Sequence, residues 1–160
     1  MTKDQNFLKS HYPDDVIKKA KQIDLLAFDV DGVLTDGGLY YDHEGNELKK
    51  FFAQDGHGIK IVQSIGIEIM IISGRQAACV DHRAQELGIK YVVQGSRDKL
   101  KSFHEQNTSI SLEKVCFVGD DTVDVGILNS VGLSVVVPNS NPTIDIKQFD
   151  WVTKRNGGYG

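Results

Sequence analysis

Short apolar runs alternate with helical patterns along most of the chain, and this alternation constrains the fold more than any other feature. The runs lie at 23–30, 67–72, 89–93, 114–118 and 133–137. Apolar stretches of this length are typical of strands buried on both faces of a parallel sheet. Helical patterns separate them, at 58–65, 75–87, 98–106 and 123–131. The sequence therefore predicts an α/β fold, a doubly wound, Rossmann-like parallel sheet with helices on both faces.

One segment, at about 38–53, breaks the alternation. Leu39-Tyr40-Tyr41 and Leu48 to Phe52 flank the polar stretch Asp42 to Glu47, which predicts a β-hairpin directly after the first strand. An isolated two-stranded hairpin is marginally stable in water. We therefore expect it to pack on something else, and its aromatic side chains favour another subunit over packing within the hairpin.

Composition excludes several classes of protein. A length of 160 residues fits one domain, 1–160. The formal charge of −4, from 18 basic and 22 acidic residues, argues against a nucleic-acid partner. No apolar run approaches the ~18–20 residues of a membrane span. The N-terminus has no signal-peptide pattern. Cys79 and Cys116 lie in apolar segments and are interpreted as buried free thiols of a reducing compartment, so a cytoplasmic protein is expected.

Polar side chains follow four of the predicted strands. They are Asp29 and Asp31, Ser73 with Gly74 and Arg75, Lys99, and Asp120 with Asp121 and Asp124. Parallel strands bring their carboxyl ends to one edge of a sheet, where ligands bind. Clustered carboxylates repel one another and so require a cation, and oxygen ligands favour Mg²⁺. Mg²⁺, a lysine and a hydroxyl together suit the binding of a phosphoryl group.

The spacing of the first two carboxylates has its own explanation. Residues two apart in a strand point the same way, so Asp29 and Asp31 can face one site while Val30 enters the core. Gly32 then permits a sharp turn.

These motifs resemble, in order, the four motifs of the haloacid dehalogenase-like phosphohydrolases. A finer pattern is similar to the 3-deoxy-D-manno-octulosonate 8-phosphate phosphatases: DVDGVLTDG, the hairpin, Asp55-Gly56 with Gly58-Ile59, ISGR, and Asn156-Gly157-Gly158. The resemblance covers most of the chain and implies a domain without a cap, a homotetramer built around the hairpins, and a role in lipopolysaccharide precursor synthesis. Such relatives continue past the Gly-Gly pair with a charged tail that helps to cover a neighbouring subunit's site, whereas this sequence ends at Gly160. The resemblance therefore does not say how the substrate is covered here.

The resemblance also implies a role for each site residue. Asp29 is the nucleophile that forms an aspartyl-phosphate, and Asp31 is the general acid and then the base. Ser73 and Lys99 bind the phosphoryl group, with Gly74 and Arg75 beside the substrate. Mg²⁺ is held by the Asp29 carboxylate, the Asp31 backbone carbonyl and Asp120. Asp121 and Asp124 lie in an outer shell around the metal.

Plainer interpretations stay open for several residues. Ser73 can cap a helix, Arg75 can be a surface arginine, and Asp121 and Asp124 can favour a helix N-terminus. His57 is expected in a loop. Cys79 and His82 are too few for a zinc site.

Other functions also stay open. The substrate can be a nine-carbon rather than an eight-carbon keto sugar acid phosphate. A phosphorelay receiver shares the sheet, the acidic pair, the hydroxyl and the lysine, but its lysine comes last, whereas Lys99 precedes Asp120. A catalytically silent assembly domain is a third possibility, against which the complete residue set argues.

Overall fold

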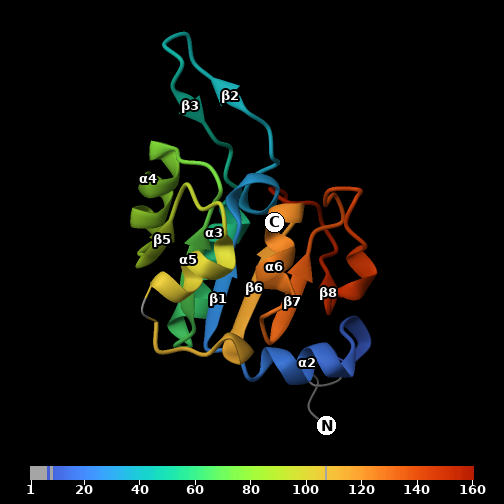
Figure 1. The fold of residues 1–160 in the computed structure, drawn as a ribbon. Helices are drawn as coiled ribbons and strands as arrows, with labels where there is room; N and C mark the ends of the chain where they lie inside the picture. The colour runs from blue at the N-terminus through green and yellow to red at the C-terminus, as the bar shows by residue number, and fades with distance from the viewer. Residues whose placement is uncertain (1–6, 8, 107) are drawn as a thin grey trace.

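A six-stranded parallel sheet forms the centre of the molecule (Figure 1). The structure, a computed structural model, describes residues 7, 9–106 and 108–160. The strands run in the order β5-β4-β1-β6-β7-β8. Their bounds are β1 (Leu25–Phe28), β4 (Glu68–Ile72), β5 (Tyr91–Val93), β6 (Val115–Gly119), β7 (Leu133–Val136) and β8 (Trp151–Val152). Because the chain winds outward from β1 on both sides, the predicted doubly wound sheet is confirmed.

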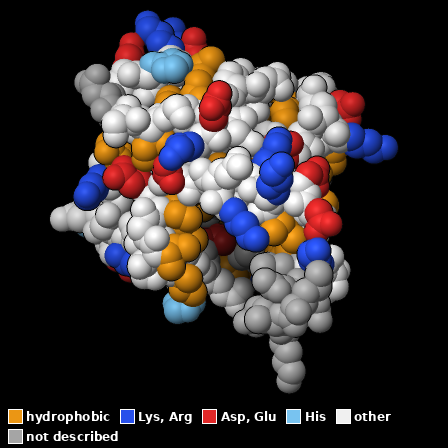
Figure 2. Space-filling model, turned by 90° about the horizontal axis from the view of Figure 1, so that it is seen from below, with side chains coloured by type: hydrophobic (Ala, Val, Ile, Leu, Met, Phe, Trp, Pro, Cys, Tyr) orange, Lys and Arg blue, Asp and Glu red, His pale blue; other side chains and the backbone are white. Residues whose placement is uncertain are grey.

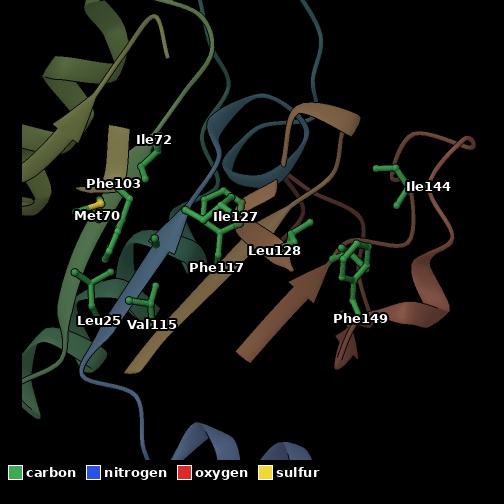
Figure 3. Packing of buried hydrophobic residues seen from close by; sticks show 12 residues of the cluster. Leu25, Met70, Ile72, Phe103, Val115, Phe117, Ile127, Leu128, Ile144 and Phe149 are labelled. Carbon is green, nitrogen blue, oxygen red and sulfur yellow. The ribbon is translucent and has the colours of Figure 1, made fainter. Parts of the chain in front are cut away.

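Helices cover both faces of this sheet. They are α2 (Asp14–Ala20), α3 (Ala53–Ser64), α4 (Ala78–Leu87), α5 (Lys99–Glu105) and α6 (Val125–Leu128). Leu25 and Ala27 of β1 point to one face, where Phe103 of α5 packs (Figure 3). The alternate residues Leu26 and Phe28 point to the other face, beneath α2, α3 and α4. Burial on both faces explains why the strands are continuous apolar runs.

The predicted hairpin is present and shorter than 38–53. It consists of β2 (Tyr40–Tyr41) and β3 (Glu47–Leu48), paired antiparallel, and it projects beyond the carboxyl edge of the sheet (Figure 1). Asp42 closes its turn by accepting hydrogen bonds from the backbone of Glu44 and Asn46. Tyr40, Tyr41 and Leu48 are exposed, so the hairpin stands away from the core.

Several predicted boundaries are wrong, each for a local reason. The first strand ends at Phe28 rather than at residue 30, because a tight turn over Val30–Leu34 follows it. Helix α3 begins at Ala53 rather than at 58. The glycines Gly56 and Gly58 weakened the helical pattern there, yet Gly56 lies in α3 where a β-carbon would meet the Arg83 side chain.

Two further elements differ from the expectation. Helix α4 begins at Ala78 rather than at 75, and a short 3-10 turn plus α6 replaces the single helix expected at 123–131. The edge strand β8 was not predicted, since a two-residue strand leaves almost no period-2 pattern to detect.

The end of the molecule opposite the hairpin carries an apolar groove. Figure 2 shows this end, where apolar side chains lie among charged ones. The groove of about 660 Å³ lies between α2, β7 and β8, with Tyr12, Ile17 and Trp151 in its wall. Lys21 and Asp24 are the charged residues among its described lining. None of the predicted site residues lines this groove. No helix in the described part of the chain is long and apolar enough to cross a membrane.

Candidate active site

Asp29 begins the site at the carboxyl end of the central strand. Its backbone N–H still donates to Val118 of β6 at 3.0 Å, and its side chain accepts a hydrogen bond from the Val30 N–H at 2.7 Å. Val30 is fully buried, as predicted, and anchors the turn in the core. Asp29 is therefore fixed at both its backbone and its side chain. The residue as a whole is only 6% exposed.

The turn after Asp29 is held by close backbone contacts. Gly32 has a φ of 92°, and a β-carbon there would lie 2.0 Å from Asp120 Oδ2, so any other residue would strain the backbone and displace the Asp120 carboxylate. The C-terminal segment packs on the same turn, because the Gly158 N–H donates to the Val33 carbonyl at 2.9 Å. A β-carbon at Gly157 would lie 1.5 Å from the Gly32 carbonyl oxygen. The late Asn-Gly-Gly motif thus supports the catalytic edge.

Lys99 is the central cation of the site. It is the first residue of α5, after the N-cap Asp98, and is 1% exposed. Its ammonium lies 2.9 Å from Asp29 Oδ2 and 2.5 Å from Asp124 Oδ1. Each carboxylate stabilises the charge that burial would otherwise penalise.

Asp124 lies deeper than expected for an outer position. It is completely buried, and its Oδ2 accepts hydrogen bonds from the backbone N–H groups of Asp120 and Asp121. Oxygen atoms of Asp29, Asp120 and Asp124 all lie within 4.8 Å of one another. Asp121, in contrast, turns outward and accepts from Thr122 and from the Asn141 amide.

This crowding raises the pKa of two carboxyls. Burial raises the pKa of Asp120 to about 7, and the neighbouring carboxylates Asp29 and Asp124 add to the effect. Burial likewise raises the pKa of Asp29 to about 6, against the opposing attraction of Lys99. Without a further cation, the folded protein therefore resists ionising this cluster.

A pH dependence of stability follows for the metal-free protein. Asp29 and Asp120 hold protons more tightly when folded than at their ordinary pKa of 3.8. The folded state then binds more protons than the unfolded state between about pH 4 and pH 7, so stability falls as pH rises through this window. We expect the Tm in EDTA to drop by at least about 3 °C between pH 5 and pH 8, since ~1 kcal/mol shifts Tm by about 2–4 °C.

The same measurement has two controls. Asp120→Asn should remove most of the pH dependence, because its amide does not ionise. Added Mg²⁺ should raise the Tm at pH 8 in the wild-type protein and less in the variant. A Tm that rises steadily from pH 5 to pH 8 in EDTA would contradict the electrostatic account of the cluster.

The cluster has the properties of a site for a hard cation. It offers oxygen ligands of the kind that Mg²⁺ prefers. Asp120 Oδ1 is buried without a hydrogen-bond partner in the structure, and the like charges around it need neutralising. The residues present therefore fit the predicted magnesium ion.

Asp31 lies apart from this acidic cluster. It follows the end of β1, so the strand geometry expected for the Asp29 and Asp31 pair does not apply. Its side chain forms an ion pair with Lys49, from the base of the hairpin. Asp31 Oδ2 is buried without a hydrogen-bond partner. The carboxyl is thus held by one oxygen, and the other oxygen is free.

The loop after β4 supplies Ser73, Gly74 and Arg75. Ser73 is 1% exposed, and its hydroxyl accepts from the Arg75 N–H at 3.2 Å rather than capping α4, whose N-cap is Ala77. The Arg75 side chain extends toward the hairpin, where it lies 2.9 Å from Glu47 Oε2. Arg75 is therefore placed at the rim, outside the carboxylate cluster.

The remaining candidates lie outside the cluster. His57 is exposed on α3, in a helix rather than in the expected loop. Cys79 is half-buried and His82 is exposed. The sequence interpretation missed Lys49 and Glu47. Their spacing of two in extended chain is typical of side chains on one face of a hairpin, but that spacing does not say which face meets the site.

Comparison with known proteins identifies the family. A family model of haloacid dehalogenase-like hydrolases matches residues 98–159. The 3-deoxy-D-manno-octulosonate 8-phosphate phosphatase of Escherichia coli K12 is 44% identical over 148 residues, covering 91% of this chain and 78% of the relative.

Two crystal structures of relatives agree in fold. That of the same-named phosphatase from Yersinia pestis has a TM-score of 0.87 at 41% identity and covers 91% of this chain and 79% of its own. The Moraxella catarrhalis phosphatase, described as a complex with magnesium ion, phosphate ion and KDO, has a TM-score of 0.86 at 39% identity. The match covers 92% of this chain and 85% of that chain.

The chain belongs to the haloacid dehalogenase-like hydrolases, and among them to the family of 3-deoxy-D-manno-octulosonate 8-phosphate phosphatases. The predicted family, the absence of a cap domain from the described residues and the enzyme class of phosphoric monoester hydrolase are confirmed. The prediction of Mg²⁺ is confirmed for the family by the magnesium-bound relative, and the acidic cluster agrees with it.

Proposed function

We propose that this protein hydrolyses 3-deoxy-D-manno-octulosonate 8-phosphate to the free sugar acid and phosphate in lipopolysaccharide precursor synthesis, with Mg²⁺ as cofactor. The observation that carries the proposal is the buried Lys99 between Asp29 and Asp124, next to Asp120, in a chain 44% identical to a phosphatase of that name. In this arrangement a lysine and an acidic metal site flank one fixed carboxylate. Phosphoryl transfer depends on such positive charges around the transferring group, because they stabilise its negative charge in the transition state.

In the first step, an Asp29 carboxylate oxygen attacks phosphorus while the bond from phosphorus to the ester oxygen breaks. Asp31 gives its proton to that leaving oxygen, and the product sugar acid departs. Burial raises the pKa of Asp29 in the metal-free protein, whereas the positive charge of Lys99 favours the carboxylate that acts as the nucleophile. Lys99 lies 2.9 Å from it and stabilises the negative charge that gathers on the phosphoryl oxygens.

In the second step, water attacks phosphorus of the aspartyl-phosphate. Asp31, now a carboxylate, accepts the proton of this water, and the bond between Asp29 and phosphorus breaks. Phosphate is released and Asp29 is regenerated. Ser73 follows β4, the strand paired with β1, and from this edge its hydroxyl would donate to a phosphoryl oxygen.

Asp29, Asp120 and the Asp31 backbone carbonyl would hold the magnesium ion. When bound, it neutralises the carboxylates and draws electron density from the phosphoryl group. Asp124 does not need to reach the ion, because its two oxygens already engage Lys99 and the backbone of Asp120 and Asp121.

A phosphate-release screen tests the proposal. Wild-type protein with Mg²⁺ is offered the eight-carbon acid phosphate, its nine-carbon relative and glucose 6-phosphate. The expected result is the highest kcat/KM for the eight-carbon ester and no turnover in EDTA. Highest activity on the nine-carbon ester would reassign the substrate. Phosphorylation of Asp29 once per chain without turnover would indicate a receiver-like domain, and no reaction at all would indicate an assembly domain.

We further propose that the hairpin mediates a cytoplasmic homotetramer. Tyr40 is 44%, Tyr41 56% and Leu48 52% exposed, whereas Phe51 packs back on the core cluster beneath α3 and α4. The apolar surface available for association is thus on β2 and β3 rather than on the whole predicted aromatic cluster. Light scattering on the wild-type chain tests the assembly, and a monomer at micromolar concentration would contradict it.

A further inference from the structure

The hairpin sends one buried lysine into the catalytic edge. Lys49 lies directly after β3, and its side chain is 1% exposed, although the hairpin around it is open to solvent. A buried ammonium is costly unless it is paired. Two carboxylates pair with it: Asp31, and Glu47 Oε1 at 2.7 Å.

The pairing divides the two oxygens of Asp31 between different tasks. Oδ1 accepts the hydrogen bond from the Lys49 ammonium. Oδ2 is buried and has no partner in the structure. A carboxyl that donates and accepts a proton during catalysis needs one oxygen free toward the reacting atoms and a fixed orientation for that oxygen. Lys49 supplies the fixed orientation.

Lys49 is itself held in place from the other side. Glu47 Oε1 binds Lys49, while Glu47 Oε2 binds Arg75 at 2.9 Å. Arg75 also donates to the Tyr41 hydroxyl at 3.3 Å. The series Asp31, Lys49, Glu47, Arg75 therefore joins three separate segments: the turn after β1, the hairpin, and the loop after β4.

We propose that Lys49 is a positioning residue for Asp31, so that the hairpin, through the Glu47 and Lys49 pair, sets the geometry of proton transfer in phosphate-ester hydrolysis. This inference rests on the proposed function, because it assigns Asp31 the acid and base role. In the first step the proton moves from Asp31 Oδ2 to the ester oxygen as the bond to phosphorus breaks. In the second, the same oxygen accepts a proton from water. Lys49 takes part in neither transfer and keeps Oδ1 turned away.

The test compares leaving groups in one set of variants. Lys49→Met removes the charge at similar length, Lys49→Arg keeps a donor, and Lys50→Met is the matched control. Lys50 is the adjacent lysine, 52% exposed and paired with Asp36 at 2.7 Å. Single-turnover phosphorylation and steady-state rates are measured with the eight-carbon sugar acid phosphate and with p-nitrophenyl phosphate, whose leaving group needs little protonation.

The expected result is a loss in kcat of about 10–100-fold for Lys49→Met on the sugar phosphate, as is typical when a group that orients an active-site ligand is removed. KM should change less than threefold by our estimate, since the proposal has Lys49 act through Asp31 and not on the substrate. Phosphorylation by p-nitrophenyl phosphate should be slowed much less. Lys49→Arg should recover part of the loss, and Lys50→Met should match the wild type.

A double variant separates positioning from general damage. Because Lys49 acts through Asp31, Asp31→Asn with Lys49→Met should be no slower on the sugar phosphate than Asp31→Asn alone. Circular dichroism melts check that each variant folds. If Lys49→Met does not fold, Glu47→Gln, which loosens Lys49 from its second carboxylate, takes its place with the same expected leaving-group pattern.

The outcomes are distinguishable. A wild-type protein that releases no phosphate from either ester would overturn the proposed function and this inference with it. An active wild type in which Lys49→Met keeps full kcat, or raises only KM, would overturn the inference alone. Equal losses on both esters, or losses that multiply with those of Asp31→Asn, would also overturn it.

Discussion

Replacing Asp29 by asparagine is expected to abolish turnover, with kcat falling by at least about 10⁴-fold, the scale seen when a nucleophile is removed. The amide is nearly the same size as the carboxylate but cannot form an acyl-phosphate. The fold should survive, because the amide oxygen can still accept the Val30 N–H bond that fixes the side chain. The measurements are phosphate release with Mg²⁺ and thermal unfolding.

Asp24→Asn is the matched control for this variant. Asp24 precedes the same strand, is about half exposed, and pairs with Lys114 on the surface, so its loss should leave kcat unchanged. The Tm of metal-free Asp29→Asn at pH 8 should not fall below that of the wild type, since burial already favours the neutral form of Asp29 up to about pH 6. Near-normal turnover by Asp29→Asn would refute the covalent mechanism.

The positions of five of the strands along the chain could be predicted because burial on both faces leaves a clear apolar signature. Once the strands are placed, the residues at their carboxyl ends follow, and Asp29, Ser73 and Asp120 do lie at the edge expected of them. Lys99 lies at a helix start, as predicted, and the structure adds the reason: Asp98 caps α5. These inferences required only local pattern and the geometry of parallel sheets.

Contacts that depend on how separate segments meet could not be predicted. The acid Asp124 is one turn beyond β6, and sequence alone allowed it to serve merely as a favourable charge at a helix start. Its ion pair with Lys99 depends on the distance between α5 and the turn before α6. The contact between Lys49 and Asp31 similarly depends on the orientation of the hairpin relative to the sheet, which the pattern of two-residue strands does not predict.

Glycine was the other source of error. Gly56 and Gly58 lowered the helical signal and delayed the expected start of α3, whereas the structure uses the missing side chain of Gly56 to admit Arg83. The same residue type at Gly32 marks a place where the catalytic turn passes Asp120 too closely for a β-carbon. A glycine in the sequence thus signals either weak structure or close packing, and the residue alone does not distinguish them.

Lys99 offers the second large effect, on stability as well as on rate. Its ammonium is the cation between two buried carboxylates, Asp29 at 2.9 Å and Asp124 at 2.5 Å. Lys99→Met keeps most of the side-chain volume but leaves both carboxylates without a counter-charge. Breaking a buried ion pair in this way costs about 3–5 kcal/mol. We also expect kcat to fall by about 10²–10³-fold or more, because a donor to the developing phosphoryl charge is lost.

A double variant tests whether the unpaired buried charges cause the loss of stability. Adding Asp124→Asn to Lys99→Met removes one of the stranded charges, so the double variant should regain part of the lost unfolding free energy while remaining inactive. Lys101→Met, in the same helix with a side chain 72% exposed, should change stability by less than about 0.5 kcal/mol. Urea unfolding at pH 8 in EDTA measures all of these variants. Asp124→Asn can keep both backbone hydrogen bonds, because they share one oxygen, Oδ2. Recovery should still be partial, because Asp29 remains without its counter-charge. No recovery at all would mean that the stranded charge of Asp124 is not the cause of the lost stability.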